Sequence, residues 1–498
     1  MASALQRVSA LRRASAECAG SPDSGGPADG RPVHPVSPVF AGRAAELACL
    51  ASALTAVRSR EPVTILLGGE AGIGKSRLVS EFGAMCAGLG AVVLRGACPA
   101  DSAGEPFAPF PAVLARLAAE VGTDGLARLA GGRSEGELWR LLPELGPAPA
   151  PPGERYRAAA RARLFGQVLA ALGHMSERAP VVLAIEDAHW AGRSARDLLW
   201  SLVRNQQRMG RVMVLITFRS DELHRMHPLR LLLAQLGCIR WVRRASLPPL
   251  SRDETAEQVA GILAGEPEPG LAESVYARSA GIPLLVEELA RCDQPGCQSV
   301  HDLVLAGARR LPPDTQGVLR AASAGGGWVG HALLARVTGV TDDRLPAVIR
   351  PAISAKVVVT SAGAYAFRHD LIREAFYDDL LPGEQCRLHA RFAEAIGSDP
   401  ALLRGGSAAR QLFRHWYRAH DVTAALQAAW QAAADAERAL GHAEQLAMLS
   451  RVLELWDRVP GAARFIGADH RAVVERAIGV AQCMGEHGRA AALAAERQ

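Results

Sequence analysis

Eight consecutive residues have the types and spacing of a loop that could hold a phosphate group. They are Gly69, Glu70, Ala71, Gly72, Ile73, Gly74, Lys75 and Ser76, and they fit the pattern G-x-x-x-x-G-K-[ST]. Glycines let backbone N–H groups turn inward around an anion, because no Cβ obstructs the turn. Lys75 would reach the β- and γ-phosphates of a nucleotide, and the Ser76 hydroxyl would hold Mg²⁺.

The neighbouring residues place this loop between a strand and a helix. Residues 63–67 form a short apolar, β-branched run, which predicts a buried strand. Residues 76–82 have apolar side chains at helical spacing, so a helix is expected to begin where the loop ends. Its N-terminus would add roughly half a positive charge beside the phosphate. This context favours a nucleotide site over a chance glycine turn.

Two acidic residues follow another apolar run and could complete such a site. Residues 181–185 predict a second buried strand, and Glu186 and Asp187 come directly after it. A Mg²⁺ ion bound to a nucleotide needs an acidic partner opposite the phosphate loop. We assign Glu186 to Mg²⁺ through water, and Asp187 to orienting the attacking water. The sequence leaves open the exchange of these two roles, and also acids that are merely exposed at a strand end.

Arg219 comes at the end of a further predicted strand, residues 212–218, where an arginine can sense a γ-phosphate. Arginine is abundant in this chain, so a solvated Arg219 is the alternative. Of the 56 basic residues only Lys75 and Lys356 are lysines. Lysine at position 75 suits a site that needs a compact point charge. For His189 and Trp190 we expect core packing and no catalytic role.

Strands that alternate with helices, among them a helix expected over residues 196–204, predict a parallel α/β sheet. Ligands of such sheets bind beyond the carboxyl ends of the strands. The phosphate loop, the two acids and Arg219 all follow strands, so the sequence predicts one site at one sheet edge. Residues 122–153 have an irregular pattern and are interpreted as an insertion loop or a linker.

The chain divides by composition and pattern into five expected segments. Residues 1–37, rich in Gly, Pro, Ser and Ala, predict a disordered leader, and residues 38–245 a P-loop ATPase core. Residues 246–298 predict a helical lid that opens with a capping box from Ser251 to Glu254. Helices around two short strands predict a winged-helix domain over 299–398, and helical hairpins predict incomplete tetratricopeptide-like (TPR-like) repeats over 399–498. The expected fold is an α/β P-loop NTPase followed by an all-α region.

Composition excludes several classes of protein. With 49% hydrophobic and 21% charged residues, the sequence is typical of a soluble globular protein, and no apolar run approaches the ~20 residues of a membrane span. The net charge of +5 is mild and spread out, so it gives no indication of nucleic-acid binding. Nine cysteines are scattered, and only Cys292 and Cys297 lie close together. We expect reduced thiols, no signal peptide and a cytoplasmic location.

Together these motifs resemble a known family. The chain is similar to the N-terminal part of large LuxR-family regulators with a MalT-like signal-transduction ATPase, of the STAND type close to the AAA+ class. The matching stretches are residues 40–46, 69–76, 184–191, 217–223, 247–251, 281–289 and 365–375. The resemblance covers residues 39–495, with Ile282 at a position where the family commonly has Asn.

The resemblance implies an ATP-driven switch in transcriptional regulation with slow ATP hydrolysis. It implies that Arg43 lies near the adenine, that Pro283 packs against the nucleotide, and that His369 reaches the β-phosphate from the winged helix. ADP would hold a closed state, whereas an unidentified inducer at the helical repeats, together with ATP, would open it and permit self-association. Without the resemblance, Arg368 and His369 would be interpreted as a surface basic pair.

In this family a helix-turn-helix follows a long repeat array, whereas this chain ends at Gln498, within the repeats. We find no DNA-binding element, so a fragment, a truncated product or a stand-alone ATPase that acts through a partner all remain open. A P-loop phosphotransferase would need an acceptor pocket, for which no residues are evident. A scaffold with a vestigial site is disfavoured by the intact loop and acids. DNA binding by the winged helix is disfavoured because residues 301–320 carry no dense basic stripe.

Overall fold

The computed structural model of the 498-residue chain describes residues 39–99, 104–129, 136–142, 153, 156–290, 310–403 and 406–495. Three expectations lie wholly or partly outside these residues: the disordered leader over 1–37, the neighbouring Cys292 and Cys297, and residues 130–135 and 143–152 of the expected insertion loop. In the described part, no helix has the length and apolar character needed to cross a membrane. The six described cysteines are free thiols.

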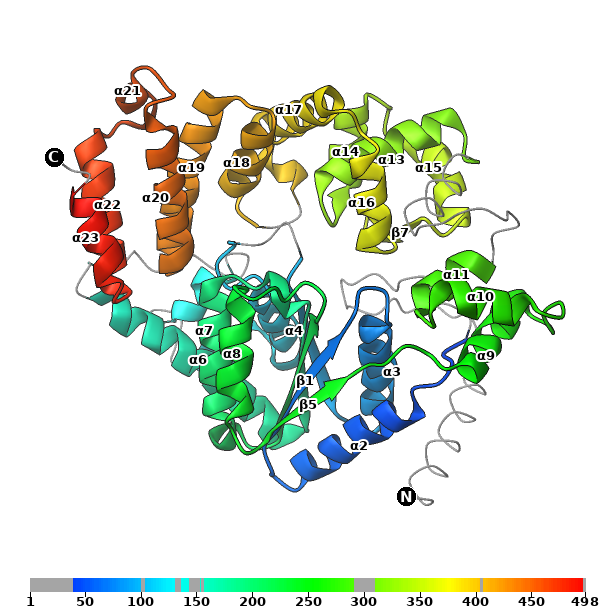
Figure 1. The fold of residues 1–498 in the computed structure, drawn as a ribbon. Coiled ribbons are helices and arrows are strands. Elements are labelled where there is room, and N and C mark those ends of the chain that lie inside the picture. The colour runs from blue at the N-terminus through cyan, green and yellow to red at the C-terminus, as the bar shows by residue number, and fades with distance from the viewer. Residues whose placement is uncertain are drawn as a thin grey trace.

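A five-stranded sheet forms the centre of the N-terminal half of the molecule (Figure 1). The strands are β1 Val63–Gly69, β2 Val92–Ala97, β3 Val181–Glu186, β4 Val212–Arg219 and β5 Val242–Ser246, in the spatial order β2-β3-β4-β1-β5. All four neighbouring pairs are parallel, which confirms the predicted parallel α/β sheet. Strand β5 was not predicted, because it is an edge strand with the exposed Arg243 and Arg244 at its centre.

Helices cover both faces of this sheet. On one side lie α2 Ala44–Arg58 and α3 Lys75–Gly88, and on the other lie α4 Phe110–Val121, α6 Arg157–Arg178, α7 Arg193–Arg204 and α8 Pro228–Gly237. Successive side chains of β1 alternate between the two faces, so Ile65 and Leu67 pack with α2 and α3, and Leu66 packs on the other side. Burial of both faces explains why these strands are apolar without interruption.

Residues 122–153 are more regular than the sequence indicated. Their described part contains α5 Thr123–Leu129 and a short 3₁₀ helix, Glu137–Arg140, and its Leu126 and Leu138 belong to the core beside α6. The buried carboxylate of Glu137 accepts hydrogen bonds from Arg140 Nε at 2.6 Å and Arg163 Nη2 at 2.7 Å. The interpretation of this stretch as an irregular loop was therefore wrong for the described residues.

Three helices follow the sheet: α9 Arg252–Leu263, α10 Leu271–Ser279 and α11 Pro283–Ala290. They pack around a small apolar cluster of their own that includes Val259, Val275 and Val286. The predicted capping box opens α9, because Glu254 N donates to Ser251 Oγ at 3.3 Å and Ser251 N donates to Glu254 Oε2 at 2.8 Å.

A second, antiparallel sheet lies among the next helices. Its strands are β6 Val329–Gly330, β7 Val358–Ser361 and β8 Ala364–Phe367, in the order β6-β8-β7. The helices are α13 Pro313–Gly325, α14 His331–Thr338, α15 Leu345–Ser354, α16 Asp370–Asp378 and α17 Pro382–Ser398. Two of these strands were predicted from the sequence. The third, β6, has two residues and is too short to show an alternating pattern.

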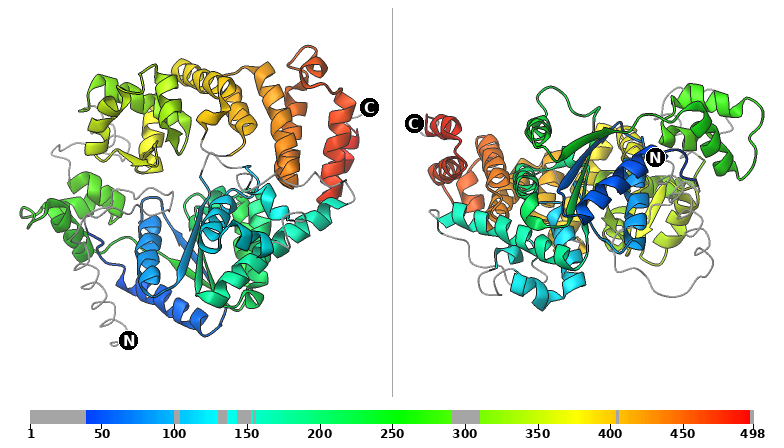
Figure 2. Two further views of the ribbon diagram at one scale, coloured as in Figure 1. Left: turned by 180° about the vertical axis from the view of Figure 1, so that it is seen from behind. Right: turned by 90° about the horizontal axis from the view of Figure 1, so that it is seen from below.

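The remaining helices are α18 Ala408–Arg418, α19 Val422–Arg438, α20 His442–Trp456, α21 Ala462–Ile466, α22 His470–Cys483 and α23 His487–Ala495. The five longer helices pack on one another in chain order, whereas the short α21 contacts α19. Buried alanines such as Ala425 and Ala429 let α19 approach its neighbours closely. Figures 1 and 2 show that the helices from α13 onward form a layer across one side of the parallel sheet and its covering helices, with α20 beside α7.

Candidate nucleotide site

The register of the parallel sheet brings the predicted site residues to one edge. Gly69 at the end of β1 is the register partner of Arg219 at the end of β4, and Ser220 N donates to Gly69 O at 3.2 Å. Strand β3, which ends at Glu186, pairs with the other side of β4. The phosphate loop, the two acids and Arg219 therefore lie at the carboxyl ends of three adjacent strands, at the same edge of the sheet.

The phosphate loop has the backbone that an anion cradle needs. Gly72 and Gly74 adopt φ values of 75° and 97°, in the left-handed region that favours glycine. Lys75 begins α3, is 7% exposed, and its Nζ donates to Gly69 O at 2.8 Å and to Glu70 O at 2.7 Å. Burial lowers the pKa of Lys75 to about 8, while the neighbouring Asp187 opposes this shift. Ser76 is exposed on the first turn of α3.

The two acids after β3 have different surroundings. Glu186 is buried, and its Oε1 accepts hydrogen bonds from Arg95 Nη2 at 2.8 Å and Arg95 Nε at 3.1 Å, on the adjacent β2. Asp187 has a left-handed backbone with φ of 54°, and its N donates to Thr217 Oγ1 at 3.1 Å. Burial and the Glu186 charge raise the pKa of Asp187, and the charges of Arg219 and Lys75 oppose this shift. The resulting pKa is about 6. Asp187 is thus the acid that is electrostatically coupled to the phosphate-loop lysine.

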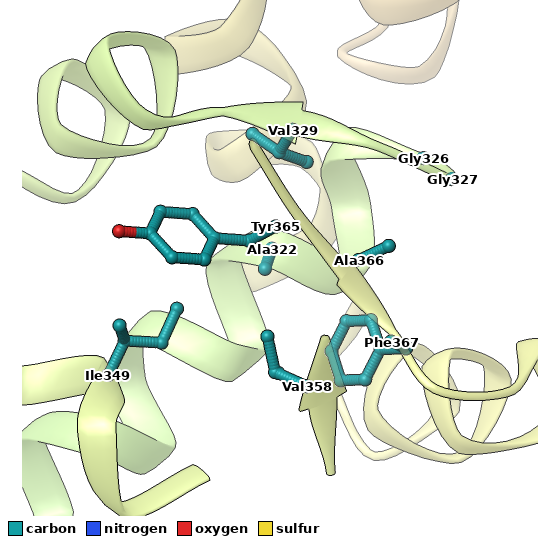
Figure 3. Close-up of a pocket in the computed structure, with 9 residues that line it drawn as sticks. All are labelled: Ala322, Gly326, Gly327, Val329, Ile349, Val358, Tyr365, Ala366 and Phe367. Carbon is teal, nitrogen blue, oxygen red and sulfur yellow. The ribbon is translucent and has the colours of Figure 1, made fainter. Parts of the chain in front are cut away.

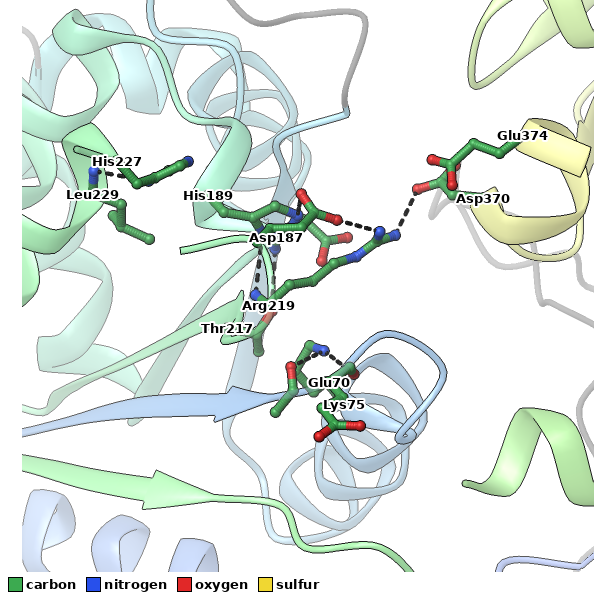
Figure 4. A network of polar contacts seen from close by, with 12 residues as sticks. Glu70, Lys75, Asp187, His189, Thr217, Arg219, His227, Leu229, Asp370 and Glu374 are labelled. Carbon is green, nitrogen blue, oxygen red and sulfur yellow. Dashed lines mark hydrogen bonds and ion pairs between the residues drawn. The ribbon is translucent and has the colours of Figure 1, made fainter. Parts of the chain in front are cut away.

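Arg219 connects the edge of the parallel sheet to the region of the small antiparallel sheet, through helix α16. Its Nη1 lies 2.5 Å from Glu222 Oε1, and its Nη2 lies 3.2 Å from Asp370 Oδ2 at the start of α16. Figure 4 shows the side chain reaching from the sheet edge toward Asp370. Arg219 N donates to Nδ1 of the buried His189 at 3.3 Å. Burial, with Arg219 and Lys75, lowers the pKa of His189 to about 3, so this ring stays neutral and acts as an acceptor.

Arg43, Pro283 and His369, which were assigned by resemblance, differ in how directly they contact the phosphate loop. Arg43 touches it directly, because its Nη2 donates to Ile73 O at 3.2 Å. Pro283 begins α11, whose next residue donates its backbone N–H to Gly72 O at 3.3 Å. His369 is the N-cap residue of α16, immediately before the Asp370 that pairs with Arg219. Pro283 is thus the neighbour of a residue whose N–H group contacts the phosphate loop. His369 is the neighbour of a residue whose side chain contacts Arg219.

Arg368 was interpreted as a surface residue when the resemblance was set aside, and this interpretation was wrong. It is 4% exposed, its Nη1 lies 3.3 Å from Glu287 Oε2, and its Nη2 pairs with Glu288. Both acids belong to α11, so Arg368 joins the end of β8 to the expected lid. Thr217 and Asp370 were also given no role, although both lie in the stretches that carry the resemblance. Only their positions in the sequence could have indicated a role, because Thr217 lies two residues before Arg219 and Asp370 directly follows His369.

The residues at this edge fit a Mg²⁺ ion that arrives with a nucleotide. Mg²⁺ on a nucleotide takes one or two carboxylates and completes its shell with phosphate oxygens and water. Ser76 and the acids Glu186 and Asp187 are donors of that kind. Among the described residues, no group of three or more His, Cys, Asp or Glu side chains is placed to hold a metal ion. An all-protein metal centre is therefore not indicated in this part of the chain.

The second sheet region contains a shallow apolar pocket that differs in kind from this site (Figure 3). Its lining residues are Ala322, Gly326, Gly327, Val329, Ile349, Val358, Tyr365, Ala366 and Phe367. These side chains carry no charge, so the pocket offers no ionic partner for a phosphate group.

Comparisons with known proteins agree with this geometry. Residues 39–216 match the sequence family described as the AAA ATPase domain. An uncharacterized protein of Rhizobium meliloti strain 1021 is 25% identical over 273 residues, which are 49% of this chain and 25% of that protein. The chain thus matches about a quarter of that relative's length.

The structural comparison extends this similarity beyond the ATPase domain. A signal transduction ATPase with numerous domains (STAND) from Pyrococcus horikoshii, which has a tetratricopeptide repeat sensor, has a TM-score of 0.51 at 14% identity. The similarity covers 92% of this chain and 64% of that one. Residues 39–216 are therefore similar to AAA ATPase domains, and the predicted fold class, a P-loop NTPase sheet followed by helices, is confirmed.

Proposed function

We propose that this chain is an ATP-binding switch of the signal-transduction ATPase class that hydrolyses ATP slowly. One observation carries the proposal: the buried Lys75 ammonium lies over the carbonyls of a left-handed glycine loop, at the N-terminus of α3. The hydrogen bonds of this lysine go to backbone carbonyls, and a phosphate group is the natural partner for its charge. The surrounding AAA ATPase domain supports the same ligand.

Each residue at the edge then has a proposed role. The loop from Gly69 to Ser76 binds the phosphates. A Mg²⁺ ion bound with the nucleotide would neutralise part of the phosphate charge. Glu186 and Asp187 share the Mg²⁺ contact and the orientation of the attacking water. Because Glu186 already pairs with Arg95, Asp187 is favoured for the Mg²⁺ contact and Glu186 for orienting the water. This is the alternative assignment of the two acids that the sequence left open. Arg219 senses the γ-phosphate.

The resemblance supplies the remaining roles in this proposal. Arg43 lies near the adenine, Pro283 packs against the nucleotide, and His369 contacts the β-phosphate. The contact of Arg43 with the loop and the position of α11 against Gly72 support these assignments. An inducer at the helical repeats triggers the switch in the cytoplasm, and nucleotide-dependent self-association follows. Transcriptional regulation is the output that a LuxR-family regulator would have.

The Arg219–Asp370 ion pair favours a switch over the alternatives. A γ-phosphate and Asp370 compete for the same guanidinium, so ATP would weaken a contact that ADP leaves intact. A phosphotransferase would instead need an open path for its acceptor at this edge, which α16 approaches here. A stand-alone ATPase or scaffold that acts through a partner would retain the same nucleotide contacts without a transcriptional output.

The nucleotide released from acid-denatured, purified protein tests this proposal directly. We expect ADP in near-stoichiometric amount when the released nucleotide is identified by chromatography. Steady-state hydrolysis of ATP should be slow but above that of a Lys75→Ala variant prepared in the same way. An empty site in a folded protein that binds neither ADP nor ATP would contradict the proposal. Rapid turnover with a small-molecule acceptor would favour the phosphotransferase instead.

A further inference from the structure

The turn between α19 and α20 of the helical repeats is embedded in the ATPase core. Leu440 in this turn is 1% exposed and belongs to the same apolar cluster as the core helices α4, α6 and α7. Two ion pairs also join the repeats to the core: Arg157 of α6 pairs with Glu437 at the end of α19, and Arg193 of α7 pairs with Glu486, which precedes α23. The repeats are thus anchored to the core by both apolar and charged contacts.

Glu444, on the first turn of α20, makes the most specific of these contacts. It is 3% exposed, and its carboxylate accepts hydrogen bonds from Ser194 N, at 3.1 Å, and from Ser194 Oγ. Ser194 is the second residue of α7. The first N–H groups of a helix have no partner within the helix, and a carboxylate there satisfies them and complements the positive end of the helix.

Helix α7 has no such group of its own. Its N-cap residue is Gly192, without a side-chain cap, and its first turn contains no acidic residue. Glu444 supplies both missing features from a segment 250 residues further along the chain. The start of α7 is therefore completed only while the repeats are docked.

The helix start is directly connected to the nucleotide site. Asp187 lies six residues before Arg193, and the short 3₁₀ helix Ala188–Trp190 lies between them. His189 in that helix accepts the hydrogen bond from Arg219 N. We propose that Glu444 is a positioning residue of the nucleotide site, which holds the Asp187–Gly192 segment through the start of α7. This inference rests on the proposed function and adds a route by which the repeats influence that site.

Two measurements on the full chain test this role. The variants are Glu444→Ala, Glu444→Gln and, as a control, Glu475→Ala at an exposed position on α22. We expect Glu444→Ala to increase backbone amide exchange over residues 192–198 and to speed release of a fluorescent ADP analogue about tenfold. Glu444→Gln, which keeps one acceptor oxygen, should lie between the wild type and Glu444→Ala in both readouts. The control should match the wild type.

Each outcome either supports or overturns the positioning role. Faster amide exchange with unchanged ADP release would mean that Glu444 stabilises α7 only, and would overturn it. Unchanged amide exchange would show that Glu444 is no cap. If Glu444→Ala fails to fold by circular dichroism, Ser194→Ala replaces it, and the same two changes are expected to be smaller. A wild-type protein that binds no nucleotide would refute both the proposed function and this role. In that case amide exchange over residues 192–198 would still show whether Glu444 caps α7.

Discussion

Lys75 is one of only two lysines in the chain, which gives its test a natural control. We predict that Lys75→Ala weakens ADP and ATP binding by at least about 100-fold, because a buried charge-assisted contact to phosphate is lost. The fold should be retained, since the Nζ contacts only two loop carbonyls. Calorimetric titration and circular dichroism measure the two effects. Lys356→Ala should bind nucleotide as the wild type does, and wild-type affinity in Lys75→Ala would refute the assignment of the loop.

Arg368 allows a stability prediction at the same scale. Arg368→Met should lower the free energy of unfolding by about 3 kcal/mol, because it leaves the acids Glu287 and Glu288 without their shared cation. Glu288→Gln in the Arg368→Met background should recover part of that loss. Urea unfolding of the two single variants and the double variant gives the coupling energy. Additive effects of the two substitutions would show that this ion pair is not energetically coupled.

Residues with a local pattern were predictable, and residues whose partners are distant were not. The phosphate loop and the acids after β3 are contiguous motifs next to apolar strands, so the sequence alone places them at one sheet edge. The burial of Arg368 depends on Glu288, 80 positions away, and the pairing of Arg219 depends on Asp370, 151 positions away. No spacing rule within one element carries this information.

The same limit applies to whole elements. Strands β1, β3 and β4, which have continuous apolar runs, were predicted to within two residues, whereas the exposed edge strand β5 and the two-residue β6 were not predicted. Helix α7 was expected from residue 196 but begins at Arg193. Its first turn has no capping sequence of its own, and the cap comes from Glu444 in another segment. The start of this helix is therefore a tertiary feature that the local sequence does not encode.

Helices α17 and α18 pack through a pair of buried histidines. His389 Nδ1 lies 2.9 Å from His415 Nδ1, the hydroxyl of Tyr377 lies 3.0 Å from His389 Nε2, and the His415 ring stacks on Phe392. Burial, reinforced by the nearby Arg414 and Arg418, lowers the pKa of His389 to about 3. The same causes hold the pKa of His415 well below its ordinary value. Both rings are therefore neutral in the folded protein at neutral pH.

This pair predicts a loss of stability in acid. The unfolded chain binds protons at these histidines as the pH falls through about 6.5, while the folded chain does not, so unfolding becomes easier. Each histidine should lower the free energy of unfolding by about 1.4 kcal/mol between pH 7.5 and 5.5. Urea unfolding across this range should show a smaller pH slope for His389→Gln than for the wild type. The exposed His487→Gln is the control, and an unchanged slope in His389→Gln would contradict the prediction.

At the scale of the whole molecule, the helical layer is attached to the ATPase core at two ends. Near the nucleotide edge, Asp370 of α16 pairs with Arg219. Beyond α7, the α19–α20 turn inserts Leu440 into the core, and Glu444 caps α7. Both attachments lead to Arg219, directly in the first case and through His189 in the second. A ligand that disturbs either end would therefore change the surroundings of the same guanidinium.

The Arg219–Asp370 pair can be tested without removing a group that we assign to nucleotide binding. Asp370→Asn keeps the size of the side chain and removes the charge that competes with a γ-phosphate for Arg219. We predict that ADP is released roughly two- to fivefold faster, because a partly exposed ion pair contributes at most about 1 kcal/mol. ATP should then bind more tightly relative to ADP than in the wild type. Stopped-flow release of a fluorescent ADP analogue and competition by ATP measure these effects.

The matched control for this variant is Asp378→Asn, at the exposed far end of the same helix α16. Both substitutions remove one carboxylate charge from helix α16, so a general electrostatic effect on nucleotide binding would appear in both. Only Asp370→Asn removes the contact with Arg219. Equal ADP release in the two variants and the wild type would show that this ion pair does not hold the closed arrangement. A change confined to Asp370→Asn would identify the pair as the point where the nucleotide and the helical layer compete.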